Sequence, residues 1–221
     1  MKLNIIYFAL LSLIFYSCAS MQKPVNEAYL SEMTNEEKAR LDKIEMEIIA
    51  KKKDKDKTKE DYIISKQMIQ VCNADILQTS NFRTLLLERE KLFTLTKDSV
   101  KLAEIHKKLK ENETAKTQKN SYLKYNIAKK NEQEVLLEVK KSQMAVLIAK
   151  LDYEKAKIAK EYQSKRPEKF SKKDLVDDKK YKKFLDDQLK KLDENKLEHK
   201  KKIDLLTKAD EELGKSGYKE E

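Results

Sequence analysis

Glycine and proline are almost missing from this chain of 221 residues, which contains two of each. Both glycines, Gly214 and Gly217, lie near the C-terminus, and neither residue type occurs between Pro24 and Pro167. Because glycine and proline are the strongest breakers of regular structure, their absence permits very long helices. A sheet-rich domain would need many more turn residues, so the sequence predicts helices.

Tryptophan is absent, and charged residues make up 40% of the chain. The charges have both signs, with 49 Lys and Arg against 39 Asp and Glu, and the net charge is +10. Intermixed charge at this density is typical of long solvent-exposed helices and coiled coils, and it argues against a compact domain. We therefore expect an all-α protein, an elongated helical hairpin or coiled coil of two to four long helices.

Cysteine is also scarce, and the two cysteines are Cys18 and Cys72. Lys2 precedes an apolar run at residues 5–16, which has the length of a signal peptide and is too short for a permanent membrane span. The residues Phe15-Tyr16-Ser17-Cys18 resemble the lipobox of bacterial lipoproteins, in a relaxed form similar to that of spirochaetes and Bacteroidetes. The resemblance implies that residues 1–17 are removed and that Cys18 receives acyl chains such as palmitate.

Lipid attachment at Cys18 implies a membrane-bound protein, because two or more acyl chains anchor a protein stably. Ala19 and Ser20 lack the acidic signal that retains enterobacterial lipoproteins at the inner membrane, so the resemblance favours the outer membrane, on either its periplasmic or its outer face. The alternatives are ordinary cleavage after Ala19, which would release a soluble protein, and anchoring by the uncut segment. Cys72 lies among apolar neighbours, and we expect it to be buried rather than bridged to another chain.

Helix signals and breaks divide the chain into segments. Thr34 and Glu37 match a capping box, Pro167 disfavours helix just before it, and Gly214 is expected to cap the last helix. Residues 171–174 are expected to cap that helix at its start. The predicted segments are a signal peptide (1–17), a lipidated N-terminus and tether (18–33), a helical hairpin or coiled-coil body (34–162), a linker (163–173), a charged C-terminal helix (174–214) and a tail (215–221).

The most apolar stretch, residues 62–109, is the expected packing centre. Its apolar residues recur at intervals of three, four and seven, as in a helix that faces partners: Leu85, Leu92, Leu95, Leu102, Ile105 and Leu109. Polar residues at 78–81 and 94–99 are candidate breaks, because their side chains compete for backbone hydrogen bonds. The polar segment 111–121 is the preferred tip of the hairpin.

A seven-residue repeat predicts a second coiled-coil seam, formed by Leu137, Met144, Leu151 and Ile158. Alanines between these positions permit close approach of a neighbouring helix. Residues 141–162 resemble the helical hairpins of outer-membrane efflux channels and periplasmic membrane-fusion adaptors. The resemblance implies a helical hairpin and, as an alternative function, a periplasmic accessory to an efflux or secretion channel.

No residue pattern supports catalysis or a metal site. Neither His106 nor His199 has a second metal ligand at i+4, and no glycine before residue 214 is available for a phosphate loop or a nucleophile elbow. His199 occupies a leucine heptad position between Leu192 and Leu206, where a polar residue more often sets register than binds metal. We expect no enzyme activity, and no cofactor other than the covalent lipid.

The lysine-rich stretch 101–130, which surrounds Tyr122 and Tyr125, is the best candidate for a polyanion site; a solvated hairpin surface is the alternative. The candidate residues are Lys107, Lys108, Lys110, Lys116, Lys119, Lys124, Lys129 and Lys130. Export argues against nucleic acid and leaves acidic glycans, anionic lipids or a host ligand. The sequence thus predicts a non-catalytic protein that binds or scaffolds at the cell envelope, through self-association or with another helical envelope protein.

Overall fold

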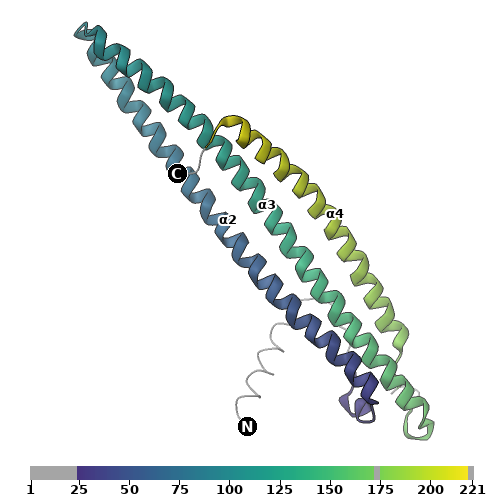
Figure 1. The fold of residues 1–221 in the computed structure, drawn as a ribbon. Coiled ribbons are helices and arrows are strands. Elements are labelled where there is room, and N and C mark those ends of the chain that lie inside the picture. Colours follow the sequence, from purple (N-terminus) through teal and green to yellow (C-terminus); the bar gives the residue numbers. More distant parts are fainter. Residues whose placement is uncertain (1–23, 172–174, 219–221) are drawn as a thin grey trace, which may run out of the picture. The chain divides into compact units, whose positions relative to one another are not determined.

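The computed structural model describes residues 24–171 and 175–218, and helices dominate both ranges. Its elements are η2 (Glu27–Leu30), α2 (Asn35–Leu95), α3 (Ser99–Ser164), η3 (Pro167–Lys169) and α4 (Asp178–Ser216) (Figure 1). No strand occurs in the described ranges, so the predicted all-α class with two to four long helices is confirmed. The predicted signal peptide, Cys18 and most of the predicted cap at 171–174 lie outside the described residues.

The chain divides into two compact units. Unit 1 comprises Met1–Glu47 and Val146–Leu189, and unit 2 comprises Ile48–Ala145 and Lys190–Glu221. η2 and η3 therefore belong to unit 1, whereas the turn between α2 and α3 belongs to unit 2.

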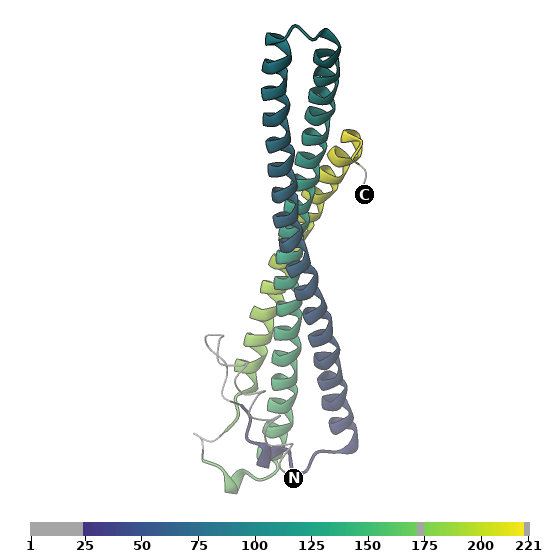
Figure 2. The same ribbon diagram turned by 90° about the vertical axis from the view of Figure 1, so that its left-hand side faces the viewer.

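The turn between α2 and α3 lies at residues 96–98 (Figure 2). Lys97 has a φ of 54°, in the left-handed region, and Asp98 Oδ1 accepts a hydrogen bond from the Lys101 amide at 3.1 Å. This bond caps α3 and is the main reason why the pKa of Asp98 is lowered. The candidate break at 94–99 is thus the turn, and the preferred tip at 111–121 is wrong.

Residues 111–121 are helical, and polar side chains there bond to the helix itself. Asn120 Nδ2, for example, donates to the Lys116 carbonyl at 2.9 Å. In the other candidate break, 78–81, the Thr79 hydroxyl donates to a carbonyl four residues back at 2.8 Å. Side chains that bond in this way need not end a helix, so polarity alone did not identify the turn.

A small apolar cluster holds unit 1 together. Its buried members are Val25, Leu30, Leu41, Ala156, Ile158 and Ala159. Ala156 and Ala159 are 0% exposed, so the helices approach closely at these positions. The predicted tether at 18–33 is too long, because its described part, residues 24–33, packs onto this cluster through Val25 and Leu30. Apolar burial favours this packing over a free linker.

Two side-chain interactions fix the N-terminal residues of unit 1. The predicted capping box is confirmed: the Thr34 amide donates to Glu37 Oε2 at 2.7 Å, and the Glu37 amide donates to Thr34 Oγ1 at 3.2 Å. The bond from the Thr34 amide is the main cause of the lowered pKa of Glu37. Both oxygens of Glu32 accept from Arg166, whose guanidinium lies 4.4 Å from the ring centroid of Tyr162.

In unit 2, α2 turns a row of mostly small polar residues toward α3. These residues are seven positions apart and at most 6% exposed, and we name them the α2 seam: Thr58, Ser65, Cys72, Thr79 and Leu86. The three seam hydroxyls donate to carbonyls four residues back, so they are satisfied without water. From α3, Asn112 Nδ2 donates to the Thr79 carbonyl at 3.1 Å, and Asn126 Nδ2 lies 3.6 Å from Cys72 Sγ. The predicted burial of Cys72 is confirmed.

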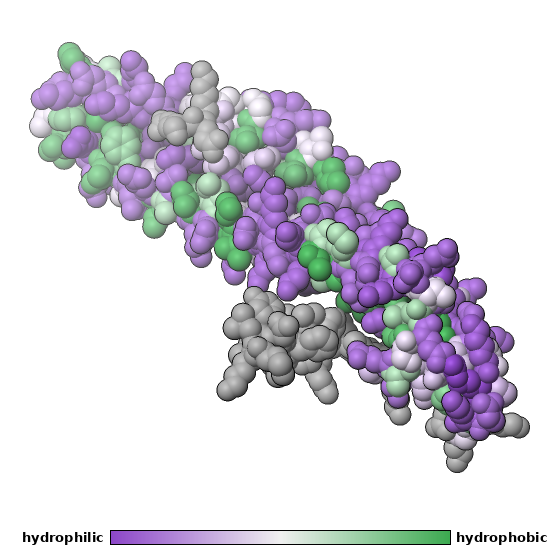
Figure 3. All heavy atoms as spheres, turned by 60° about the horizontal axis from the view of Figure 1, so that its bottom comes forward, coloured by the Kyte–Doolittle hydropathy of each residue, from purple (hydrophilic) through white to green (hydrophobic). Residues whose placement is uncertain are grey.

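The predicted packing centre was assigned to the wrong face of α2. Ile105 of α3 is 4% exposed, but Leu85, Leu92 and Leu95 are 55%, 54% and 82% exposed. Two series of α2 residues have the same seven-residue spacing and lie one residue apart: the α2 seam and the series that contains Leu85 and Leu92. The seam has the smaller side chains and faces α3, where it allows a shorter distance between the helices. Figure 3 shows the result on one face: a mainly hydrophilic surface with separate hydrophobic patches.

α4 begins and ends later than the predicted range 174–214. At its start, Asp177 Oδ1 accepts a hydrogen bond from the Lys179 amide at 3.2 Å. At its end, Gly214 lies inside the helix, and the glycine that reverses the chain is Gly217, with a φ of 70°. A left-handed residue just past the helix is the usual place for a C-cap glycine.

We predict that Cys72 is unreactive in the folded protein. It is 3% exposed, and burial raises the pKa of its thiol, so little reactive thiolate forms. Alkylation at pH 8 should be at least about tenfold slower than in the guanidinium-unfolded chain. Mass spectrometry of the Cys72 peptide measures both rates, and equal rates would contradict the burial of the seam.

Candidate functional site

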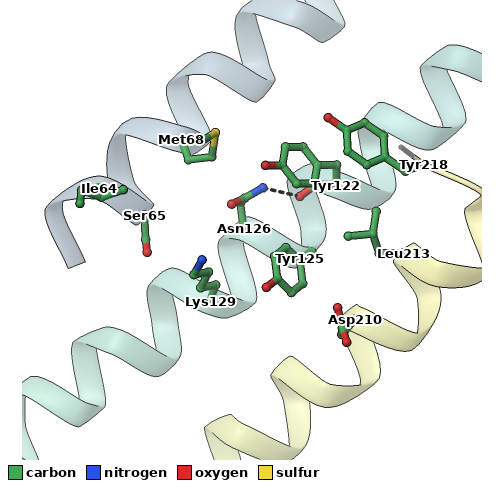
Figure 4. A pocket seen from close by; sticks show the side chains of 10 residues that line it. All are labelled: Ile64, Ser65, Met68, Tyr122, Tyr125, Asn126, Lys129, Asp210, Leu213 and Tyr218. Carbon is green, nitrogen blue, oxygen red and sulfur yellow. Dashed lines mark hydrogen bonds between the residues drawn. The ribbon is translucent and has the colours of Figure 1, made fainter. Parts of the chain in front are cut away.

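Three segments of unit 2 surround a cleft of about 370 Å³ (Figure 4). Its lining residues are Ile64, Ser65 and Met68 of α2, Tyr122, Tyr125, Asn126 and Lys129 of α3, and Asp210, Leu213 and Tyr218 at the end of the chain. Four of these residues, two tyrosines, an asparagine and a lysine, come from the lysine-rich stretch 101–130. The cleft is therefore the place where that stretch meets α2 and α4.

Stacked tyrosines form one wall of the cleft. The ring centroids of Tyr122 and Tyr218 are 4.4 Å apart with the rings 13° from parallel, and those of Tyr122 and Tyr125 are 6.4 Å apart at 15°. Lys129 Nζ lies 6.0 Å from the centroid of Tyr125. Because aromatic faces carry negative potential, such a wall attracts cations and planar groups.

The chain end is held in place so that Tyr218 reaches this wall. Gln118 Nε2 donates to the carbonyls of Ser216 at 3.2 Å and of Gly217 at 3.1 Å. These bonds satisfy carbonyls that a helix end leaves without partners. The left-handed Gly217 then turns the chain back toward α3, where the ring of Tyr218 stacks on Tyr122.

The cleft has groups that can bind a ligand by stacking and by charge. Its charged lining residues are Lys129 and Asp210, and no histidine or cysteine is among the described residues that line it. The Ser65 hydroxyl donates to the Asp61 carbonyl at 2.9 Å, inside its own helix. A serine nucleophile needs a base within hydrogen-bond reach, and the hydrogen bond of this hydroxyl goes to a backbone carbonyl instead. The arrangement supports recognition of a ligand by stacking and charge.

The eight predicted polyanion-binding lysines all lie on α3, but they do not share one face. Lys107 and Lys116 are nine residues apart, which at about 100° per residue places them on opposite sides of the helix. Lys130 pairs with Glu134 at 2.5 Å and lies 5.6 Å from the ring of Tyr62, and Lys124 pairs with an acidic residue of α4.

The remaining lysines are partly free of such contacts. Lys107 forms an i,i+4 ion pair at 3.9 Å, and Lys129 faces the cleft. The others form no ion pair with a residue of the described ranges: Lys108, Lys110, Lys116 and Lys119. Binding of an acidic glycan by this set remains a prediction.

A buried polar layer joins α3 and α4 in unit 2. His199 Nε2 lies 2.6 Å from Glu132 Oε1, and the two side chains are 19% and 9% exposed. The other Glu132 oxygen accepts from Gln133 Nε2 at 2.8 Å, and Asn195 Nδ2 donates to Ser142 Oγ at 2.6 Å. A polar residue at a leucine heptad position can set helix register. That role, which the sequence predicts for His199, stays a prediction.

His106 lies at the surface, where its Nε2 is 2.7 Å from Glu90 Oε1 and its side chain is 60% exposed. Within residues 24–171 and 175–218, no three His, Cys, Asp or Glu side chains gather closely enough to hold a metal ion. None of the helices in these ranges combines the length and hydrophobicity that crossing a bilayer requires.

Several residues of the cleft and of the polar layer were not predicted from the sequence. Asp210 and Glu132 carried no signal, because each is one of 39 acidic residues. Tyr218 did carry one: a large side chain just after a C-cap glycine often packs back onto its helix. The predicted cap was Gly214, whereas the cap in the structure is Gly217, so the prediction did not include Tyr218.

We predict strong coupling between Glu132 and His199. Glu132→Leu or His199→Leu alone should lower the free energy of unfolding by about 1–3 kcal/mol, because each leaves a buried polar partner unpaired. The double variant, which extends the leucine heptad, should recover most of this loss. Urea unfolding measures all four proteins, and additive losses in the double variant would contradict the pairing.

No family model matches the chain, and neither a curated protein nor a solved structure matches it. Its function is therefore inferred from its own residues.

Proposed function

We propose that the protein is an exported lipoprotein, anchored to the outer membrane by acyl chains on Cys18, that acts by binding or scaffolding through its helices and not by catalysis. The observation that carries the proposal is the N-terminal sequence: Lys2, the apolar run at 5–16 and the lipobox-like residues 15–18. These are the parts that export and lipid attachment require.

The packing of the N-terminal residues determines which part of the protein a lipid on Cys18 would hold. Val25 and Leu30 are each 9% exposed and belong to the apolar cluster of unit 1. The chain from Cys18 to Val25 spans at most about 25 Å when fully extended. A lipid on Cys18 would therefore hold unit 1 beside the membrane.

The segment that resembles efflux and adaptor hairpins gives little support to the alternative, a periplasmic accessory to a channel. Its small residues Ala149, Ala156 and Ala159 are 0% exposed, and the last two belong to the cluster of unit 1. They pack within this chain and are not open to a channel helix. The scaffolding role instead draws on the exposed apolar residues of α2 in unit 2.

The test is incorporation of radiolabelled palmitate in the native host, with protease treatment of the same intact cells. Label should be present on the wild type, absent from Cys18→Ala and unchanged on Cys72→Ala, the matched control at the other cysteine. Label on Cys18→Ala, or none on the wild type, would contradict lipid anchoring.

Protease treatment decides between the two faces of the membrane. Cleavage of residues 24–218 on intact cells, with a periplasmic marker left whole, would place the helices at the cell surface and direct the search toward extracellular ligands. Protection on intact cells with cleavage after the outer membrane is opened would favour the periplasmic alternative.

A further inference from the structure

One face of α2 in unit 2 carries apolar side chains that the chain itself leaves exposed. We name this face the α2 stripe, and its thirteen residues are Ile64, Gln67, Met68, Val71, Ala74, Asp75, Gln78, Asn81, Phe82, Leu85, Glu88, Arg89 and Leu92. Five of them are large and 46–58% exposed: Ile64, Val71, Phe82, Leu85 and Leu92. Ten of the thirteen are uncharged, in a chain of which 40% is charged. Depletion of charge with retained aromatic and aliphatic residues marks the centre of an interface.

The middle row of the stripe reads similarly in both directions. Ile64, Val71, Gln78, Leu85 and Leu92 are seven residues apart, with Gln78 at the centre. An isologous dimer places one patch against its own copy, so residues at equal distances before and after the symmetry axis meet. With the axis at Gln78, Ile64 meets Leu92 of the other copy and Val71 meets Leu85.

We infer that a second copy of this chain covers the α2 stripe, with the two α2 helices antiparallel about a two-fold axis at Gln78. The inference deepens the proposed scaffolding function and rests on it, because it names the partner through which the helices act. The two Gln78 amides lie on the axis, and each can donate to the other and accept from it. Apolar residues pack on both sides of this one polar contact.

The residues beside the middle row are compatible with the same pairing. In an antiparallel pair each flank faces the same flank of the partner. One flank sets Met68 against Arg89 and Asp75 against Phe82, and the other sets Gln67 against Glu88 and Ala74 against Asn81. None of these contacts places two like charges directly opposite, although the chain has a net charge of +10.

This register also gives the tyrosine cleft an occupant. Met68 lines the cleft, so Arg89 of the second copy lies at its mouth, about 16 Å along the helix from the axis. The cleft offers the Asp210 carboxylate and the stacked tyrosines, the partners that a guanidinium prefers. Neither Arg89 nor Asp210 forms an ion pair with another residue of the described ranges. The dimer would therefore contain two such contacts.

The test is disulfide crosslinking of the full chain in membranes of the native host, read as dimer on non-reducing gels. Gln78→Cys should crosslink to itself, because the two Cα atoms on the axis lie within disulfide range. Val71→Cys and Leu85→Cys should each fail alone, since each is about 21 Å from its own copy, and should crosslink when the two are expressed together.

Asn73→Cys is the matched control, because it is exposed on the opposite side of α2. Crosslinking at Gln78→Cys no greater than at Asn73→Cys would overturn the inference. Crosslinking of Val71→Cys and Leu85→Cys each to itself would also overturn it, since that pattern requires parallel helices. The same crosslinks are expected in the Cys18→Ala form, so failure of anchoring and failure of pairing give different results.

A charge exchange tests the contact at the cleft in the Gln78→Cys chain. Arg89→Asp or Asp210→Arg should lower the crosslinked fraction about threefold or more, because each sets like charges together. The two changes combined should restore it. Loss without restoration would remove the Arg89–Asp210 contact from the proposal.

Discussion

The contact between α2 and α3 in unit 2 uses small side chains, and the rest of the account depends on this choice. When Cys72 and Thr79 face α3, their neighbours Val71 and Gln78 are turned about 100° away. Burial of the seam therefore exposes the apolar row beside it. If the middle row of the α2 stripe had faced α3, the hairpin would have buried more apolar area and left little apolar surface for a partner. The orientation of α2 about its own axis therefore both buries the polar seam against α3 and exposes the apolar face that we propose as the interface.

The fold class could be predicted from the sequence because it depends on the composition of the whole chain. Few glycines and prolines and a high density of mixed charge favour long helices along its full length. The helix start at Thr34 and the burial of Cys72 followed because both depend on near neighbours. The position of the turn between α2 and α3, and the face of α2 that packs on α3, could not be predicted in this way. Polar segments can bond within a helix as readily as they end one, as Asn120 does. Two equal seven-residue series also leave the orientation of α2 undecided.

The candidate site was predictable only where its residues are neighbours in sequence. Tyr122, Tyr125 and Lys129 lie within about two turns of α3, so a local pattern of aromatic residues among lysines was enough to predict them. Asp210 and Tyr218 come from a segment far along the chain, and contact between distant segments leaves no local signal. The layer between His199 and Glu132 shows the same limit: a polar heptad position was recognised, but its partner was not.

Native mass spectrometry of the full-length protein, extracted in mild detergent from the membranes of its host, tests the central claim most directly. The account predicts a dimer whose subunits each begin at Cys18 and carry the added mass of acyl chains. A monomer of unmodified chain would contradict it. Because acyl mass and copy number are read separately, lipid-bearing monomers would contradict the pairing alone, and lipid-free dimers would contradict the anchor alone.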